Sequence, residues 1–268
     1  MGWPVDHSRS PIIHNHWIAE HGLRGSYVLL PVAPEKLEQA LRALPALGFA
    51  GCNLTIPHKV AARSIVDRID PLAQRVGAIN CIVVEADGSL SGRNTDAFGY
   101  VQSLRDAHPR WQPSAGPALV LGAGGAARAV IAGLLENGVP SIRLTNRSPE
   151  KTHELVAAFG PQLMAVDWAE RHTAVDGAAL VVNTTNLGMQ GQPALDLDLA
   201  ALSPKALVSD VIYVPLETPL LAAANLRGNI TVSGLGMLLN QARPAFEAWF
   251  GVMPRISDAL LGKVHASF

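Results

Sequence analysis

The fold is decided by the stretch Ala118-Leu119-Val120-Leu121-Gly122-Ala123-Gly124-Gly125-Ala126-Ala127-Arg128. Its four leading apolar residues predict a buried parallel strand, and the alanine-rich segment behind the glycines predicts a helix that ends at Gly138. The spacing Gly122-x-Gly124-x-x-Ala127 is typical of a dinucleotide-binding turn, because small residues there allow a tight turn and a close approach to a pyrophosphate. The amides at the helix N-terminus, which carries partial positive charge, would face the phosphates. We therefore expect a nucleotide site rather than only a tight turn.

The segment after the next expected strand, Ser141–Thr145, indicates which nucleotide binds. It reads Asn146-Arg147-Ser148-Pro149-Glu150-Lys151. An acidic residue about 20 residues after the glycines usually binds the ribose of NAD, whereas an arginine accommodates the 2′-phosphate of NADP. No carboxylate stands at the end of this strand, and Arg147 and Lys151 can pair with a phosphate dianion. Ser148 before Pro149 is typical of a helix N-cap. The sequence favours NADP over the alternative of a solvated basic turn.

Composition and charge narrow the class of protein. The chain of 268 residues is long enough for one large domain or two smaller ones. Its net charge of −1 gives no field for nucleic acid or an anionic membrane. No apolar run approaches the roughly 18–20 residues that span a bilayer, and no signal-peptide pattern is present. Cys52 and Cys81 lie in strand-like apolar contexts, which favours buried thiols over a disulfide. We expect a soluble, cytoplasmic α/β protein.

The N-terminal part alternates helices and strands. The expected elements are a helix from Ser10, as its cap, to Gly22, a strand Tyr27–Leu30, an amphipathic helix from Pro34, a strand Ala50–Ile56, a helix carrying His58 and Lys59, a hairpin of Asn80–Val84 with the segment at Leu90, and a helix from Ala97. This alternation favours a mostly parallel sheet. We interpret the four histidines His7, His14, His16 and His21 as surface or cap residues and expect no metal site, because no cysteine or carboxylate set accompanies them.

The alternation continues after the glycine turn. Further strands are expected at Leu163–Val166, Leu180–Asn183, Leu207–Val211 and Ile230–Val232, and helices at Met237–Phe250 and Ile256–Val264. We interpret the region between Asp96 and Pro117 as the crossing between two domains. Ligands of parallel sheets bind beyond the carboxyl ends of the strands. The functional loops are therefore expected after Thr55, Asn80, Leu121, Asn183 and Val211.

Two residues are candidates for proton transfer. A nicotinamide enzyme acting on an alcohol needs a group that takes the hydroxyl proton as hydride leaves, and such help contributes roughly 10²–10⁴-fold. Lys59, just past a strand end, and Asp96, at a helix start, can supply an amine and a carboxylate. Taken singly, each residue also fits a common structural role, as an exposed helix lysine or an N-cap aspartate.

Several motifs, taken in order, resemble those of the shikimate dehydrogenase family. They are His7-Ser8-Arg9-Ser10-Pro11, Asn53-Leu54-Thr55-Ile56-Pro57-His58-Lys59, Gly77-Ala78-Ile79-Asn80, Gly92-Arg93-Asn94-Thr95-Asp96, the glycine turn, Asn146-Arg147-Ser148, Asp210-Val211-Ile212-Tyr213 and Gly234-Leu235-Gly236-Met237 with Gln241. The resemblance spans nearly the whole chain. It implies NADP-dependent interconversion of 3-dehydroshikimate and shikimate on the route to chorismate and the aromatic amino acids.

The resemblance also implies an architecture. An open α/β substrate domain (residues 1–96) and a Rossmann-type NADP-binding domain (residues 97–235) would face each other across a cleft, and C-terminal helices (residues 236–268) would return to the substrate domain. A homodimer is one of the assemblies that the sequence allows.

The resemblance further assigns roles to residues. Lys59 would be the catalytic acid/base and Asp96 its partner, and both would contact the substrate. The other substrate-binding residues would be Ser8, Ser10, Thr55, Asn80, Tyr213 and Gln241. NADP would be held by Gly122, Ala123, Gly124, Gly125, Ala126, Asn146, Arg147, Ser148, Lys151, Val211 and Gly234. The family often has arginine where this chain has Lys151, so the pairing with phosphate would be weaker there, because a lysine lacks the bidentate fork.

Two alternatives remain open at this stage. A quinate/shikimate dehydrogenase that prefers NAD would share the fold, but an acidic residue would then be expected at the strand end where Arg147 follows. A non-catalytic NADP-binding sensor would also share the fold, and loss of Lys59 or Asp96 would favour it. Both residues are present.

Overall fold

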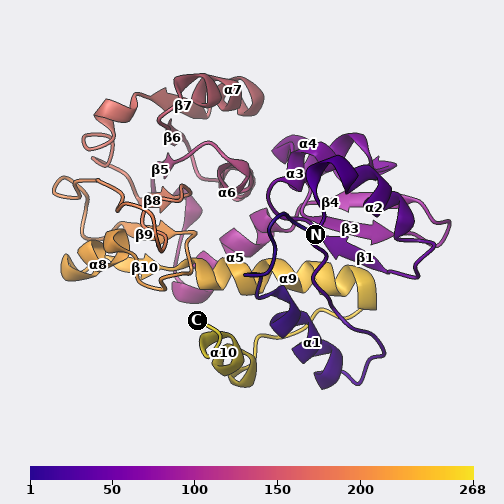
Figure 1. Ribbon diagram of the computed structural model, residues 1–268. Coiled ribbons are helices and arrows are strands. Elements are labelled where there is room, and N and C mark those ends of the chain that lie inside the picture. The colour runs from indigo at the N-terminus through magenta and orange to yellow at the C-terminus, as the bar shows by residue number, and fades with distance from the viewer. The chain divides into compact units, whose positions relative to one another are not determined.

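The computed structural model describes residues 1–268 and divides them into two compact units, each with its own sheet and hydrophobic core (Figure 1). The first unit comprises Met1–Thr95 and Leu239–Phe268, and the second comprises Asp96–Leu238. Helix α9 (Gly234–Phe250) begins in the second unit and ends in the first. The C-terminal residues therefore complete the unit that the N-terminal residues begin.

The second unit contains a six-stranded parallel sheet in the order β10-β9-β8-β5-β6-β7. Its strands are β5 (Ala118–Leu121), β6 (Ile142–Thr145), β7 (Leu163–Val166), β8 (Leu180–Asn183), β9 (Leu207–Asp210) and β10 (Ile230–Val232). Every residue of β5, β8 and β9 is buried, as expected for central parallel strands covered on both faces. The chain moves outward from β5 on both sides, so β5 and β8 flank the point where the strand order reverses. Ligands bind at such a point in open parallel sheets.

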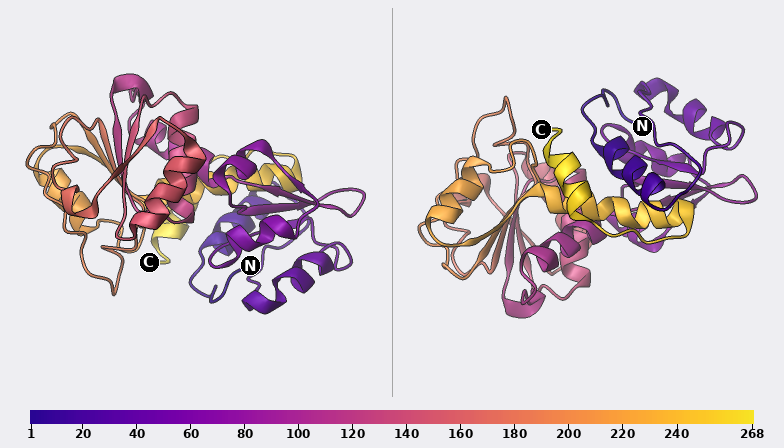
Figure 2. Two further views of the ribbon diagram at one scale, coloured as in Figure 1. Left: turned by 90° about the horizontal axis from the view of Figure 1, so that it is seen from above. Right: turned by 90° about the horizontal axis from the view of Figure 1, so that it is seen from below.

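Helices cover both faces of this sheet. α6 (Gly125–Glu136) and α7 (Pro149–Phe159) lie on one face, and α8 (Pro219–Leu226) lies on the other (Figure 2). α5 (Asp96–Ala107) packs closely on α6, because a Cβ at Gly133 would lie only 3.0 Å from the carbonyl oxygen of Ala97. Short 3₁₀ turns, Pro113–Ala115 and Trp168–Glu170, complete the connections.

The sheet of the first unit corrects the expectation of mostly parallel strands. It has four strands in the order β1-β3-β4-β2, namely β1 (Gly51–Asn53), β2 (Arg68–Ile69), β3 (Cys81–Val84) and β4 (Leu90–Arg93). β1 pairs with β3 antiparallel, β3 with β4 antiparallel, and only β2 with β4 is parallel. The tight connection between β3 and β4 forces them to run in opposite directions, and β1 joins this hairpin on its free edge. The predicted hairpin itself is confirmed.

The first unit also contains helices and turns. They are α1 (Ser10–Glu20), α2 (Leu37–Ala43), α3 (His58–Ala61), α4 (Pro71–Val76), the C-terminal part of α9, α10 (Asp258–His265) and the 3₁₀ turns Pro34–Lys36 and Ala62–Ser64. The predicted apolar stripe of Leu37, Leu41 and Leu44 is fully buried in the core. Both cysteines are free and buried, as predicted.

His14 is not the surface or cap residue that was expected. Its side chain is fully buried, stacks on Tyr27 with ring centroids 4.3 Å apart, and lies edge-on to Trp17. Neither ring nitrogen has a hydrogen-bond partner. Burial lowers the pKa of His14 to about 3, so the ring is neutral and behaves as an aromatic core residue.

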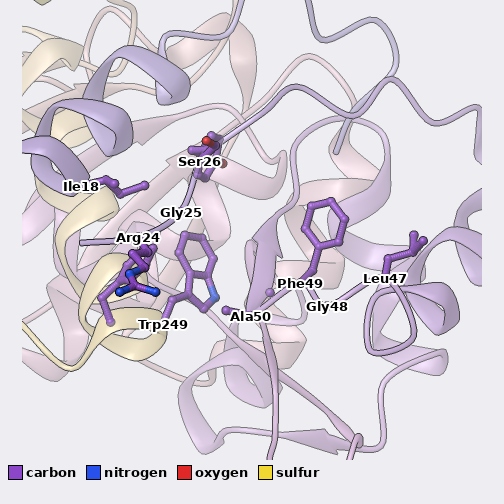
Figure 3. A pocket seen from close by; sticks show the side chains of 12 residues that line it. Ile18, Arg24, Gly25, Ser26, Leu47, Gly48, Phe49, Ala50 and Trp249 are labelled. Carbon is purple, nitrogen blue, oxygen red and sulfur yellow. The ribbon is translucent and has the colours of Figure 1, made fainter. Parts of the chain in front are cut away.

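The predicted strand Tyr27–Leu30 is wrong, because these residues form no ladder with another strand. The nearest pairing is an isolated bridge between Gly2 and Pro31. A pocket of about 300 Å³ lies between residues 24–27 and the start of β1, bordered by Gly25 and Ser26 on one side and by Phe49 and Ala50 on the other (Figure 3). The pocket is lined by residues at the amino end of β1, whereas the loop with Thr55 follows the carboxyl end. No helix of the chain is long and apolar enough to cross a membrane.

Candidate active site

In the first unit, the loop after β1 carries Thr55 and Lys59. The Thr55 amide donates to the Met1 carbonyl at 3.0 Å, and the Thr55 carbonyl accepts from the His58 amide at 2.9 Å. His58 is buried and its Nε2 lies 2.8 Å from the carbonyl oxygen of Val32, which anchors the start of α3. The Lys59 carbonyl accepts from the Ile79 amide at 2.8 Å, so the loops that carry Lys59 and Asn80 are joined through their backbones. The lysine side chain is half-buried.

Asn80 is the centre of a hydrogen-bonded group. Its Oδ1 accepts from the Thr95 amide at 2.7 Å, and its Nδ2 donates to Thr95 Oγ1 at 2.9 Å. A longer bond of 3.5 Å joins Nδ2 to Gln241 Oε1 on α9. The structure thus brings together two predicted substrate residues, Asn80 and Gln241, and fixes Thr95, which directly precedes Asp96.

Ser8 and Ser10 lie at the start of α1. The Ser10 amide donates to Ser8 Oγ at 3.3 Å, and the Ser8 amide donates to the Val5 carbonyl at 3.0 Å. The N-cap position is occupied by Arg9 without a side-chain cap, so the expectation of Ser10 as the cap is wrong; Ser10 is the first helical residue. The Ser8 hydroxyl takes over the accepting role because it lies two residues before that amide. Both serines are partly exposed and can donate to an anion.

Sequence reasoning missed two residues, Asn53 and Tyr27, that hold the Asn80 backbone through hydrogen bonds. The Tyr27 hydroxyl donates to Asn53 Oδ1 at 2.9 Å, and Asn53 Nδ2 donates to the Asn80 carbonyl at 3.0 Å. Burial raises the pKa of the Tyr27 hydroxyl, so it remains a donor. Asn53 begins the motif Asn53–Lys59, but no local pattern links it to Tyr27, which lies 26 residues earlier.

In the second unit, the glycine turn joins β5 to α6. Gly122 has φ +109°, and a Cβ there would lie 2.5 Å from Thr184 Oγ1, so no side chain fits. A Cβ at Gly124 or Gly125 would meet nothing within 4 Å, so open space lies over both. The N-cap of α6 is Gly124, without a side-chain cap, and the first amides of the helix have no acceptor in the chain. An uncapped helix start beneath open space fits a pyrophosphate.

The segment after β6 presents two cations. Arg147 and Lys151 are exposed, and neither side chain has a hydrogen-bond or ion-pair partner. Asn146 Nδ2 donates to the Ser148 carbonyl at 3.0 Å and holds the turn. Ser148 is the N-cap of α7, as predicted, although its side chain accepts no bond from the helix. The two cations fit the 2′-phosphate of NADP, and no carboxylate stands in their place.

The loop after β9 carries Val211 and Tyr213 and touches Gly234. A Cβ at Gly234 would lie 2.1 Å from the Val211 carbonyl oxygen, and the Gly234 amide donates to the Ile212 carbonyl at 2.9 Å. Tyr213 is partly buried. Asp210, at the end of β9, accepts three hydrogen bonds and is 1% exposed. The sequence did not indicate these hydrogen bonds, although Asp210 begins the motif Asp210-Val211-Ile212-Tyr213.

The predicted site residues thus fall into two groups. Ser8, Ser10, Thr55, Lys59, Asn80 and Gln241 belong to the first unit; Asp96, the residues of the glycine turn, Asn146, Arg147, Ser148, Lys151, Val211, Tyr213 and Gly234 belong to the second. No group of three or more His, Cys, Asp and Glu side chains is arranged to hold a metal ion. The parallel sheet, the glycine turn and the cations after β6 define the second unit as a dinucleotide-binding unit.

Comparison with known proteins identifies the family. Residues 1–82 match the shikimate dehydrogenase substrate binding domain, residues 110–188 match shikimate / quinate 5-dehydrogenase, and residues 234–258 match the shikimate 5'-dehydrogenase C-terminal domain. A shikimate dehydrogenase (NADP(+)) from Paramagnetospirillum magneticum is 58% identical over 260 residues, covering 97% of this chain and 94% of that protein. The chain belongs to the shikimate dehydrogenase family.

Solved structures agree with this assignment. The shikimate 5-dehydrogenase of Thermus thermophilus, in complex with NADP(H) and shikimate, has a TM-score of 0.87 at 36% identity, with 99% of this chain and 96% of that chain covered. A quinate dehydrogenase from Corynebacterium glutamicum, in complex with NAD, has a TM-score of 0.89 at 29% identity, with 98% and 95% covered. The predicted two-part α/β fold is confirmed. The fold alone does not separate the two substrates, because both enzymes share it.

Proposed function

We propose that the chain catalyses the reversible, NADP-dependent reduction of 3-dehydroshikimate to shikimate, a step of aromatic amino-acid biosynthesis. The observation that carries this proposal is the 58% identity, over 97% of the chain, to a shikimate dehydrogenase (NADP(+)). The unpartnered Arg147 and Lys151 after β6 support the choice of NADP. Two cations at this position are expected in a site that binds a 2′-phosphate, whereas a site for a free 2′-hydroxyl usually has a carboxylate.

The proposed chemistry assigns a proton to this chain and a hydride to the cofactor. NADP, when bound, supplies or accepts the hydride at the carbon that bears the reacting hydroxyl. Lys59 is the proposed acid/base that gives or takes the hydroxyl proton, and Asp96 is the proposed carboxylate that holds a substrate hydroxyl. The bond from the Ile79 amide to the Lys59 carbonyl fixes the lysine's backbone beside the Asn80 loop, which supports a role in positioning a small polar ligand.

The remaining substrate ligands are proposed by chemistry. Ser8 and Ser10 are proposed to donate to the substrate carboxylate, because neutral hydroxyls can donate to an anion without a buried counter-charge. Thr55, Asn80, Tyr213 and Gln241 are proposed to complete the shell around the ring hydroxyls and the carboxylate. The bonds among Asn80, Thr95 and Gln241 support this, since they hold the amide groups in fixed orientations.

The cofactor ligands are proposed in two groups. The turn Gly122 to Ala126 would bind the pyrophosphate through amides, with Val211 and Gly234 near the nicotinamide. Asn146, Arg147, Ser148 and Lys151 would bind the 2′-phosphate. The open space over Gly124 and Gly125 and the uncapped start of α6 support the first assignment.

One assay tests the proposal against its alternatives. Initial rates are measured with shikimate and with quinate, each with NADP⁺ and with NAD⁺. We expect the highest kcat/KM for shikimate with NADP⁺. A preference for quinate with NAD⁺ would favour the quinate/shikimate alternative. Binding of NADP⁺ without turnover of either substrate would favour the sensor.

We also propose a cytoplasmic location and a homodimer. The two free, buried thiols support a reducing compartment. Fractionation tests the location, and light scattering of the purified chain tests the assembly. A monomeric mass at all concentrations would contradict the dimer.

A further inference from the structure

Asp210 is a buried carboxylate without a cation. It closes β9, is 1% exposed, and forms no ion pair with a lysine, arginine or histidine. Burial raises the pKa of its carboxyl group, and the hydrogen bonds it accepts oppose that rise. A buried charge is costly unless many hydrogen bonds compensate it. Packing of the sheet alone does not explain a carboxylate at this position, so we expect its hydrogen bonds to have a function.

The three groups that bond Asp210 are all donors. Oδ1 accepts from the Ile212 amide at 3.0 Å. Oδ2 accepts from Thr218 Oγ1 at 2.8 Å and from Asn183 Nδ2 at 3.1 Å. Asn183 cannot turn its amide around, because its Nδ2 also donates to the Leu187 carbonyl at 3.0 Å. Both side-chain positions of residue 210 must therefore be hydrogen-bond acceptors. An asparagine has one acceptor and one N–H donor, so its N–H would face another donor.

Two of these donors lie at the two ends of the loop between β9 and α8, and the third lies at the end of the neighbouring strand β8. Ile212 follows Asp210 by two residues, and Thr218 caps α8 at the far end of the same loop. Asn183 ends β8, the strand beside β9. Asp210 therefore links the two ends of the β9–α8 loop and connects the loop to the end of β8. The loop carries Val211 and Tyr213, and its Ile212 carbonyl accepts the bond from Gly234.

The 2′-phosphate end of the cofactor would be bound by a different part of this unit. Arg147 and Lys151 follow β6, and the sheet order places β8 and β5 between β9 and β6. The glycine turn follows β5, between the two ends. A disturbance of the β9–α8 loop should therefore affect the nicotinamide half of a bound NADP and spare the adenosine 2′-phosphate half.

We propose that Asp210, through its bonds to Asn183, Ile212 and Thr218, is a positioning residue that sets the β9–α8 loop for the nicotinamide half of the cofactor. This inference rests on the proposed function, since it takes NADP as the ligand. Asp210 itself contacts no reacting atom in this scheme. Its effect passes through the backbone of Val211 and Ile212 and through Gly234.

The test compares the whole cofactor with its adenosine half. Dissociation constants of NADP⁺ and of 2′,5′-ADP are measured for the wild type, for Asp210→Asn and for Asp198→Asn, an exposed control with the same change of charge. For Asp210→Asn we expect the dissociation constant of NADP⁺ to rise about 10-fold or more, because one donor is left unsatisfied when the loop adopts its native conformation. The dissociation constant of 2′,5′-ADP should change less than about twofold. Equal weakening of both ligands, or weakening of neither, would overturn the proposal.

A second pair of variants and a ligand-free measurement keep the outcome clear. Thr218→Val removes one donor and should weaken NADP⁺ selectively, whereas Thr218→Ser keeps the hydroxyl and should recover most of the affinity. Without ligand, the Ile212 and Gly234 amides of Asp210→Asn should exchange hydrogen at least about 10-fold faster, while the Gly122 amide, bonded to the Thr145 carbonyl at 2.8 Å, keeps its rate. Unchanged exchange at Ile212 would refute the anchoring. Failure of the wild type to bind NADP⁺ would instead refute the proposed function.

Discussion

Replacing Arg147 with alanine should change the cofactor preference of the protein. The guanidinium is exposed and has no partner in the chain, so its removal breaks no internal bond. Against a 2′-phosphate it would form a charge-assisted hydrogen bond, which contributes roughly 1.5–3 kcal/mol. That loss corresponds to a rise of about 10- to 150-fold in the KM for NADP⁺. NAD⁺ lacks the phosphate, so its KM should stay within about twofold.

The assay is initial rates at saturating shikimate, with NADP⁺ and NAD⁺ varied separately. Lys205→Ala is a matched control, because Lys205 is also exposed but precedes the amino end of β9, whereas Arg147 follows the carboxyl end of β6. Added salt should reduce the difference between wild type and Arg147→Ala, since salt screens an exposed charge pair. An equal rise of KM for both cofactors would refute the role of Arg147 in binding a 2′-phosphate.

Three further changes test other parts of the site. Lys59→Ala should lower kcat by about 10²–10⁴-fold with a smaller change in KM for shikimate, and an unaltered kcat in stopped-flow or steady-state rates would remove the lysine from proton transfer. Gly122→Ala should lower the free energy of unfolding by about 1–3 kcal/mol in urea titrations, whereas Gly124→Ala should keep the stability and weaken NADP⁺, because only the first position is crowded by the chain itself. His14→Phe should flatten the acid side of the stability profile. The pKa of His14 is about 3 in the folded chain, so the unfolded chain takes up the proton first and stability falls by about 2 kcal/mol between pH 7 and pH 5. A wild-type stability that is flat over this range would contradict the buried neutral ring.

Local patterns were sufficient for the nucleotide-binding unit. The apolar runs that predicted β5 and β8 are buried over every residue, as expected for central parallel strands, whereas β9 is buried over every residue although two of its four residues are polar. The tight turn at Gly122 could be predicted because its residue types follow from backbone geometry. The first unit was harder, since the alternation of helices and strands does not fix strand direction. β2 was missed because it has two residues and begins with an exposed arginine.

His14 and Asp210 show two different reasons why the environment of a buried polar side chain is missed. The buried residues of α1 are Ile13, His14, Trp17 and Ile18, so the helical spacing placed His14 on the buried face and the signal was available. For Asp210 no such signal exists. Its partner Asn183 lies 27 residues away and Thr218 lies 8 residues away. Only the pairing of β8 with β9 shows that their polar ends converge on one carboxylate.

The two groups of site residues differ in what ligand binding must change. In the second unit, the first amides of α6 and the side chains of Arg147 and Lys151 have no partner in the chain, so a phosphate can bind without displacing an internal bond. In the first unit, the Asn80 side chain is already bonded to Thr95 and Gln241, and Ser8 accepts from Ser10. If these groups bind the substrate as we propose, its hydroxyls and carboxylate would join or replace bonds that already orient them. Such orientation would then select the stereochemistry of a small polyol, because a misplaced hydroxyl would leave a buried amide without its partner.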